Sequence, residues 1–255
     1  WGPRSMFRTF TLIALMIACA APARAALFNG GFEFGLSGWS VFPAAGVNPI
    51  RATAESSGFG ILPTEGRLQG VIETSDIDGD PAAAIEAFFD LAPGAIDGLG
   101  FDDPTGIAIQ QTVTVTAGDT LLGDINFLTN ELVQGDPGYT TNPAFDDFAV
   151  LIADGLVHIL ADVNQAGFFT SNVLLRGGNS VTGVTKETGY GPLNYIFQNT
   201  GTQKIGFAVF NVSDIGHQSA LAMDDLRIEA VPLPATGLML AAGIAGLAGL
   251  RRRRN

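Results

Sequence analysis

The sequence predicts an all-β fold, a β-sandwich, over its central part. No long stretch shows helical periodicity, and the 33 glycines are spread among short apolar runs. Within these runs apolar and polar residues alternate, and clusters of Gly, Asp, Asn and Pro separate them. A period of two places one face of a strand in a core, and the clusters mark turns. We therefore expect two packed antiparallel sheets.

The clearest predicted strand is 106–116, where Ile and Val alternate with Gln and Thr. Ala117-Gly118-Asp119 should turn the chain into a return strand at 120–128, so the two strands are predicted to form a hairpin. Further hairpins are predicted at 148–154 with 157–162, and at 202–212 with 219–229. Weaker strands are expected at 39–42, 66–73 and 194–198. Residues 82–91 fit either a strand or a short helix.

Residues 1–25 are predicted to comprise upstream residues and a signal peptide with its own helix. Met6 is the expected start, Arg8 supplies a positive charge, and 10–21 is apolar. Ala23-Arg24-Ala25 fits the small-x-small cleavage rule, so we expect signal peptidase to cut between Ala25 and Ala26. Cys19 would then be lost, and the mature chain would have no disulfide.

Residues 231–255 combine a short motif, an apolar run and a basic end. The motif is Val231-Pro232-Leu233-Pro234-Ala235, the run ends at Leu250, and Arg251–Arg254 follow. As a helix, 233–250 would measure roughly 27 Å, near the short limit for spanning a bilayer core. The arginines would stay in the cytoplasm and leave the domain outside. The sequence alone therefore predicts a C-terminal transmembrane helix.

This tail resembles the VPLPA variant of the PEP-CTERM sorting signal of Gram-negative bacteria. The resemblance implies a transient anchor in the inner membrane. It also implies recognition by an exosortase-type membrane protease and transfer of the protein to the cell surface. A permanent membrane anchor is the alternative.

The predicted domain, residues 26–230, is strongly acidic. It contains all 25 acidic residues and six of the 13 basic ones. Such a charge repels nucleic acid and anionic membranes. The acids would either be solvated or recruit divalent cations.

Two stretches resemble the ends of galactose-binding-like jelly rolls, which include several carbohydrate-binding modules. They are Asn29-Gly30-Gly31-Phe32-Glu33 and Met223-Asp224-Asp225-Leu226. The resemblance implies that the first and last strands are adjacent and hold a structural Ca²⁺. Carried over, its first-choice ligands are Asn29, Glu33, Asp224 and Asp225. Solvated acids at a capped strand edge are the alternative.

Two further acidic groups are weaker candidates for a cation. Asn130 and Glu131 end one strand and Asp146 and Asp147 begin the next, so their oxygens could converge at one end of the sandwich. This second-choice calcium or ligand site competes with ordinary hydrogen bonding at loop ends. Asp76–Asp80 has alternate carboxylates but departs from the EF-hand pattern, so an acidic turn is favoured.

A sugar site would need exposed aromatic residues. Trp39 follows a Gly turn and begins a strand, so we expect it in the core. Tyr139 and Tyr190 lie among Gly and Pro and are the candidate ligand-binding residues.

We expect no enzymatic activity. His158 and His217 lie in a strand and a turn, and G-x-S-x-G, H-E-x-x-H and nucleotide-binding motifs are absent from the sequence. The leading interpretation is an exported structural or adhesive protein of the cell surface or biofilm matrix. A carbohydrate-binding module, with polysaccharide as partner, is the alternative, and a secreted hydrolase comes third.

Overall fold

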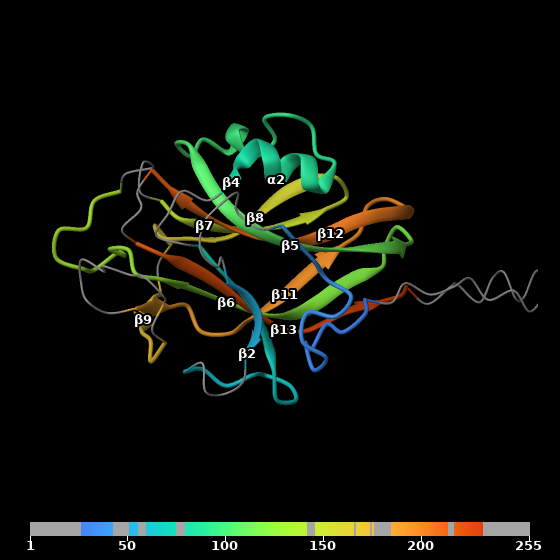
Figure 1. Ribbon diagram of the computed structural model, residues 1–255, viewed down its shortest axis with the longest axis horizontal. Helices are drawn as coiled ribbons and strands as arrows, with labels where there is room; N and C mark the ends of the chain where they lie inside the picture. Colours follow the sequence, from blue (N-terminus) through green and yellow to red (C-terminus); the bar gives the residue numbers. More distant parts are fainter. Residues whose placement is uncertain are drawn as a thin grey trace, which may run out of the picture.

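The computed structural model describes residues 27–42, 51–55, 60–74, 80–141, 146–165, 167–173, 175, 185–213 and 217–231. These residues form two antiparallel β-sheets packed face to face, with a helix on the outside of one sheet (Figure 1). The predicted β-sandwich is therefore confirmed. The cleavage site Ala25–Ala26, the motif residues Pro232–Ala235 and both terminal helices lie outside the described residues. Within the described part, no helix is long and apolar enough to cross a membrane.

The first sheet has six strands. Its order is β1 (Ser40–Phe42), β5 (Pro104–Val115), β12 (Gly201–Val212), β7 (Phe148–Ala153) and β8 (Leu156–Asp162), with β4 (Asp80–Pro81) beside β5. On its outer side lie helix α2 (Ala82–Phe89) and the short 3₁₀ helix η3 (Asp97–Leu99). Residues 82–89 of the segment 82–91 are thus helical, in agreement with one of its two predicted structures.

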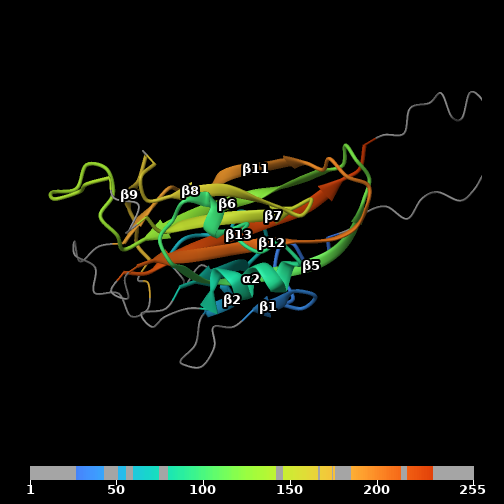
Figure 2. The same ribbon diagram turned by 90° about the horizontal axis from the view of Figure 1, so that it is seen from above.

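The second sheet has seven strands. Its order is β2 (Arg51–Glu55), β3 (Gln69–Glu73), β13 (Ser219–Glu229), β6 (Thr120–Thr129), β10 (Lys186–Glu187) and β9 (Phe169–Thr170), with β11 (Gly191–Ile196) also beside β6. β9 lies toward one end of the sandwich, and β13 ends at the other (Figures 1 and 2).

Two of the three predicted hairpins are wrong. β5 and β6 lie in different sheets, and so do β12 and β13. The connections cross from one sheet to the other, as in a jelly roll. Ala117-Gly118-Asp119 does reverse the chain, but turn residues do not say which sheet the next strand joins. The β7–β8 hairpin is confirmed, with Asp154 and Gly155 at its turn in left-handed conformations.

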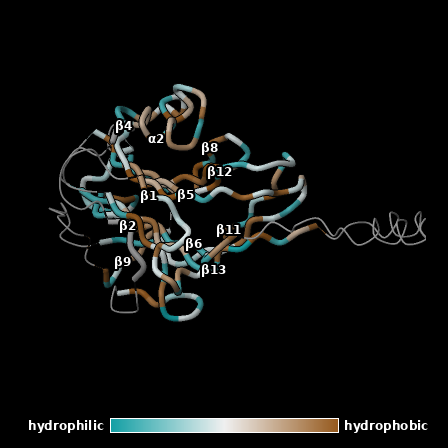
Figure 3. The backbone as a smooth tube through the Cα atoms, turned by 45° about the vertical axis from the view of Figure 1, so that its right-hand side comes forward, coloured by the Kyte–Doolittle hydropathy of each residue, from teal (hydrophilic) through white to brown (hydrophobic). Residues whose placement is uncertain are grey.

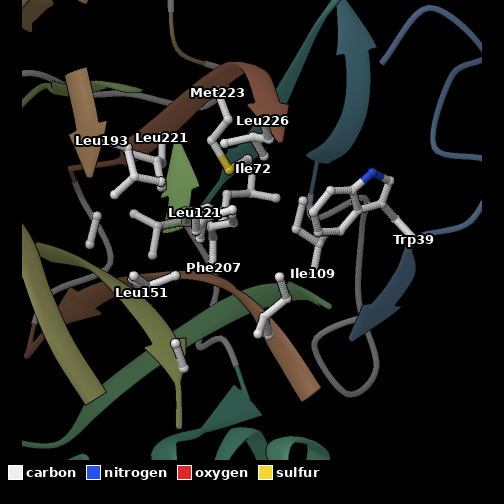
Figure 4. Packing of buried hydrophobic residues seen from close by; sticks show 14 of the residues in the cluster. Trp39, Ile72, Ile109, Leu121, Leu151, Leu193, Phe207, Leu221, Met223 and Leu226 are labelled. Atoms are coloured by element: carbon white, nitrogen blue, oxygen red, sulfur yellow. The ribbon is translucent and has the colours of Figure 1, made fainter. Parts of the chain in front are cut away.

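The main core fills the space between the two sheets. Ile109 and Phe207 project from the six-stranded sheet toward Ile72, Leu121 and Leu221 of the other sheet (Figure 4). Hydrophobic stretches run along the strands of both layers, while many of the turns are hydrophilic (Figure 3). This is the arrangement that the alternating runs predicted.

Trp39 belongs to this core, as predicted. It is 7 % exposed, and its ring stacks on Phe32 with centroids 5.4 Å apart. Its Nε1 donates to the carbonyl of Asn29 at 3.2 Å. A second apolar cluster joins Ile85 and Phe89 of α2 to Phe148 and Phe210, and so covers the outer face of the six-stranded sheet.

Candidate functional site

The residues of the first predicted calcium site have different hydrogen-bond partners. Asn29 stabilises its own loop, because its side chain donates to the carbonyls of Gly35 and Ser37. Glu33 accepts from the backbone N–H groups of Arg67 and Leu68 at 2.5 and 2.8 Å. These N–H groups hold the pKa of the Glu33 carboxyl below its usual value.

Asp224 holds the other end of the same loop. Its Oδ2 accepts from Glu65 N at 2.8 Å and from Thr64 Oγ1 at 3.2 Å. Glu33 and Asp224 therefore fasten segment 64–68 to the sandwich, one at each end. The pattern of acids in the sequence does not predict this structural role.

Glu65 is the acid that the sequence analysis missed. Its side chain is hydrogen-bonded to Asp225, and this shared hydrogen bond raises the pKa of Glu65. A β-bulge at Asp225, which has a φ of 48°, interrupts the pairing of β13 with β6 at this point. Among the described residues, no group of three or more His, Cys, Asp and Glu side chains is arranged to hold a metal ion. Calcium binding by the predicted residues stays a prediction.

The predicted adjacency of the first and last strands also needs correction. β1 pairs with β5, and β13 pairs with β3 and β6. The loop before β1 does reach β13, because Leu226 N donates to the carbonyl of Gly30 at 3.2 Å. A Cβ on Gly30 would lie only 1.7 Å from the Leu226 carbonyl oxygen, so this contact requires glycine.

The residues of the second predicted site all have partners within the protein. Asp147 is fully buried and accepts from Val212 N at 2.9 Å and Ser219 Oγ at 2.6 Å, which ties the two sheets together. Asn130 accepts from Thr185 Oγ1 at 2.7 Å. Both residues therefore have structural partners.

Glu131 and Asp146 have different surroundings. Glu131 lies 3.6 Å from His217 Nδ1. Asp146 accepts from the side-chain amide of Asn164, and its Oδ1 is buried with no hydrogen-bond partner in the described part of the chain. Burial and the nearby charge of Asp162 raise the pKa of Asp146 to about 6. The third acidic group, Asp76–Asp80, lies outside the described residues except for Asp80.

The two candidate tyrosines lie in different networks. Tyr139 donates to Asn164 Oδ1 at 2.6 Å, beside Asp146. Tyr190 packs against an apolar cluster of the seven-stranded sheet, and its hydroxyl donates to Gln69 Oε1. Their assignment to ligand binding stays a prediction. Tyr190 has both apolar and polar neighbours on its sheet.

Tyr190 lies on the face of the seven-stranded sheet that points away from the main core. We call this the outer face. Strand register and alternation place Val71, Glu73, Asn126, Leu128, Phe169, Glu187, Ala220 and Ala222 on it. Their neighbours along the strands, such as Ile72, Phe127 and Leu221, belong to the main core instead. The outer face therefore has its own set of side chains.

Aromatic and polar groups lie side by side on the outer face. Phe169, which is 52 % exposed, pairs directly with Glu187 across β9 and β10. The Phe169 ring also packs close to Gly189, because a Cβ on Gly189 would lie 3.2 Å from Cε1 of the ring. Glu187 is 6 % exposed and accepts from the side-chain amide of Asn126 at 2.6 Å. A buried carboxylate–amide pair thus lies on the same face as an exposed ring, with Glu187 as the strand partner of Phe169.

Negative charge surrounds Tyr190 on this face. Burial raises its pKa, and the charges of Asp224, Asp124 and Glu187 raise it further. The phenol therefore stays protonated and can donate. Ala220 and Ala222 leave little side-chain bulk in the centre of the face.

Part of the outer face is covered. Ile61, Val173 and Leu175 pack with Tyr190 over Val71 and the two alanines. Gln218, at one end of this face, is fully buried, and both polar atoms of its side-chain amide have no hydrogen-bond partner among the described residues.

Comparisons with known proteins do not assign a family. No protein-family model matches the chain, and no curated protein sequence does. Solved structures match with low TM-scores. A family 61 carbohydrate-binding module in complex with β-1,4-galactotriose has 15 % identity and a TM-score of 0.38, covering 82 % of this chain and 100 % of that one.

Two other solved structures are similar to the same degree. A family 28 module specific for non-crystalline cellulose has 14 % identity and a TM-score of 0.38, covering 81 % of this chain and 96 % of that one. The K3 adhesin domain of Lys-gingipain from Porphyromonas gingivalis has 10 % identity and a TM-score of 0.38, covering 81 % and 99 %. At these values we take no functional argument from the similarity.

Proposed function

We propose that the domain binds polysaccharide through the outer face of its seven-stranded sheet. The observation that carries the proposal is the placement of Phe169 and Tyr190 beside the Glu187–Asn126 pair. Sugar rings present C–H patches that stack on aromatic rings, and hydroxyl groups that pair with carboxylates and amides. A site that combines apolar rings with a few fixed polar groups suits such a ligand. The proposal concerns binding alone and assigns no reaction.

The test compares two exposed phenylalanines. The full chain is titrated with a panel of neutral polysaccharides, as the parent protein and as Phe169→Ala and Phe34→Ala. Phe34 is 74 % exposed but lies in the loop before β1. We expect Phe169→Ala to weaken binding on the order of tenfold, the equivalent of one lost stacking contact. Phe34→Ala should bind as the parent does. Equal loss in both variants, or binding by neither parent nor variant, would refute the proposal.

We also propose that the domain is exported and presented at the cell surface. The support comes from the sequence: the Val231–Ala235 motif, the apolar run and Arg251–Arg254 occur in order. An exosortase-type protease would then process the tail, after signal peptidase has removed the leader. Fractionation of cells that express the parent or a Pro232→Ala, Pro234→Ala variant tests this. Retention of the double variant in the membrane is expected, and equal release of both would refute the processing step.

We keep calcium as a proposal, but for different ligands. The pair formed by Glu65 and Asp225 is the better candidate, because the two carboxyl groups share one hydrogen bond and Asp224 lies beside them. A cation would neutralise the repulsion that this pair otherwise relieves by holding a proton. Asn29 and Glu33 are committed to backbone groups and are not included.

A further inference from the structure

Two carboxylates of the outer face have no basic partner among the side chains that the structure describes. Asp124 and Asp224 are directly opposite each other on β6 and β13, a placement that is unfavourable for like charges. Asp224 has backbone partners in segment 64–68. Asp124, which is half-buried, makes no side-chain hydrogen bond within the described part of the chain. Glu187 has Asn126 as its one hydrogen-bond donor among the same residues.

The basic side chains that the structure describes are paired elsewhere. Arg67 lies near Glu33, and Lys204 lies 2.8 Å from Asp90. Lys186 is on β10 next to Glu187, yet its Nζ contacts Asp136 at 2.5 Å. Arg227 pairs with Asp225 and Glu229. Within the described residues, the carboxylates of Asp124 and Glu187 therefore lack a cationic partner.

Two aromatic rings accompany these carboxylates. Phe169 is the strand partner of Glu187. Tyr190 is close enough to Asp124 and Glu187 for their charges to raise its pKa. Ring faces attract cations, and carboxylates beside the rings strengthen that attraction. Gln218, at one end of the same face, is fully buried, and its side-chain amide has no hydrogen-bond partner among the described residues.

We propose that the outer-face ligand is a glycan with free, protonated amino groups, which the carboxylates of Asp124 and Glu187 bind beside Phe169 and Tyr190. This inference rests on the proposed function and names the class of sugar. It excludes acidic polysaccharides such as those built from uronic acids, because their carboxylates would meet the same negative face. The acidic domain as a whole would also steer a cationic polymer toward the protein.

The test uses three oligosaccharides and the full chain. Oligomers of glucosamine, N-acetylglucosamine and galacturonic acid are titrated at low salt, at a pH that keeps the amines protonated. The first two share a backbone and differ in charge. We expect the glucosamine oligomer to bind on the order of tenfold more tightly than its acetylated form, an advantage that salt should reduce. The galacturonic acid oligomer should not bind.

Three variants locate the effect. Glu187→Gln and Asp124→Asn should each lose most of the preference for the amino sugar. Asp97→Asn removes the same charge beside α2, on the opposite side of the sandwich, and should keep the preference. Circular dichroism shows whether each variant is folded. Having both Asp124→Asn and Glu187→Gln keeps the test valid if one of them fails to fold.

The other outcomes separate this inference from the proposed function. Equal binding of the charged and acetylated oligomers would overturn the inference and leave polysaccharide binding in place. An equal loss in Asp97→Asn would show general attraction to an acidic protein, which also overturns it. If none of the oligomers and none of the neutral polysaccharides binds, both proposals fail.

Discussion

Phe169 and Glu187 are directly paired residues on β9 and β10, so an exposed ring and a buried carboxylate are neighbours on one face of the sheet. The pair depends on two very short strands that join the edge of β6. The side-chain amide of Asn126 on β6 donates to the Glu187 carboxylate at 2.6 Å. The site therefore depends on the middle of the sheet for its geometry, while the ring stays accessible at the edge.

We predict that Gly30→Ala destabilises the protein more than an ordinary surface change. The added methyl group would overlap the Leu226 carbonyl oxygen at 1.7 Å and push the first loop away from β13. Overpacking of this kind costs about 1–3 kcal/mol or more. Urea unfolding of the full chain measures the effect. Gly98→Ala is the control, because a Cβ there meets no atom within 4 Å. Equal stability of the two variants would contradict the close approach.

Asp154 should contribute strongly to stability. Its carboxylate accepts from the hydroxyl of Tyr195 and the backbone N–H of Gln198, both at 2.7 Å, and so joins the β7–β8 turn to the chain after β11. These donors hold its pKa below the ordinary value. We expect Asp154→Asn to lower the free energy of unfolding by about 1–2 kcal/mol, measured with urea at pH 7.

The pH dependence gives a second check on Asp154. Because its pKa is lower in the folded state, its contribution is present above pH 4 or so and is lost as the pH falls through the folded-state pKa. The difference between parent and variant should therefore shrink in acid. Asp90→Asn is a matched control, since Asp90 is also left-handed but its side chain is 73 % exposed. A loss of similar size in that control would refute the special role of Asp154.

Asp146 should affect the pH dependence of stability in the opposite direction to Asp154. Its folded-state pKa of about 6 lies above the ordinary value, so the folded protein binds this proton more tightly than the unfolded chain does. The contribution of this group therefore makes the protein less stable as the pH rises from about 4 to about 6. We predict that Asp146→Asn is more stable than the parent at pH 7 by about 1–2 kcal/mol, since solvent reduces the full effect.

Thermal unfolding at pH 4 and pH 7 tests this prediction. The parent and Asp146→Asn should have similar melting temperatures at pH 4 and differ at pH 7. A variant that is less stable than the parent at pH 7 would contradict the account. It would favour the second predicted site instead, where an ion binds the Asp146 carboxylate.

Calcium has its own prediction. If the cation binds Glu65 and Asp225, the melting temperature of the full chain should rise with Ca²⁺ and fall with excess chelator. A ligand at 100 times its dissociation constant stabilises the folded state by about 2.7 kcal/mol. Glu65→Gln should abolish the response to Ca²⁺. Glu229→Gln should keep it, because Glu229 is exposed and lies at the end of β13, the strand that also carries Asp225. Identical curves with Ca²⁺ and chelator would refute calcium binding.

The sequence predicts the strands better than their partners. Alternation along 106–116 is enough to place Ile107 and Ile109 in the core. It does not say that the next strand crosses to the other sheet, because the turn at Gly118 suits either path. Long-range pairing decides that question, and local sequence does not contain it.

The candidate site was predicted only in part. Tyr190 was selected for its Gly and Pro neighbours, and it does lie on the outer face. Phe169 and Glu187 were missed because β9 and β10 have two residues each, too few to show alternation. Glu33 and Asp224 were selected as ion ligands through the resemblance to jelly-roll ends, whereas their backbone partners in segment 64–68 are visible in the fold alone.

Mapping the bound sugar by NMR would locate the binding surface residue by residue. The full chain, labelled with ¹⁵N, is titrated with the oligosaccharide that binds best. We expect the largest shifts at the side-chain amide of Asn126 and the backbone amides of Phe169, Glu187 and Tyr190, with little change in α2. Shifts confined to another surface, or no shifts at saturating sugar, would contradict the assignment of the outer face as the binding site.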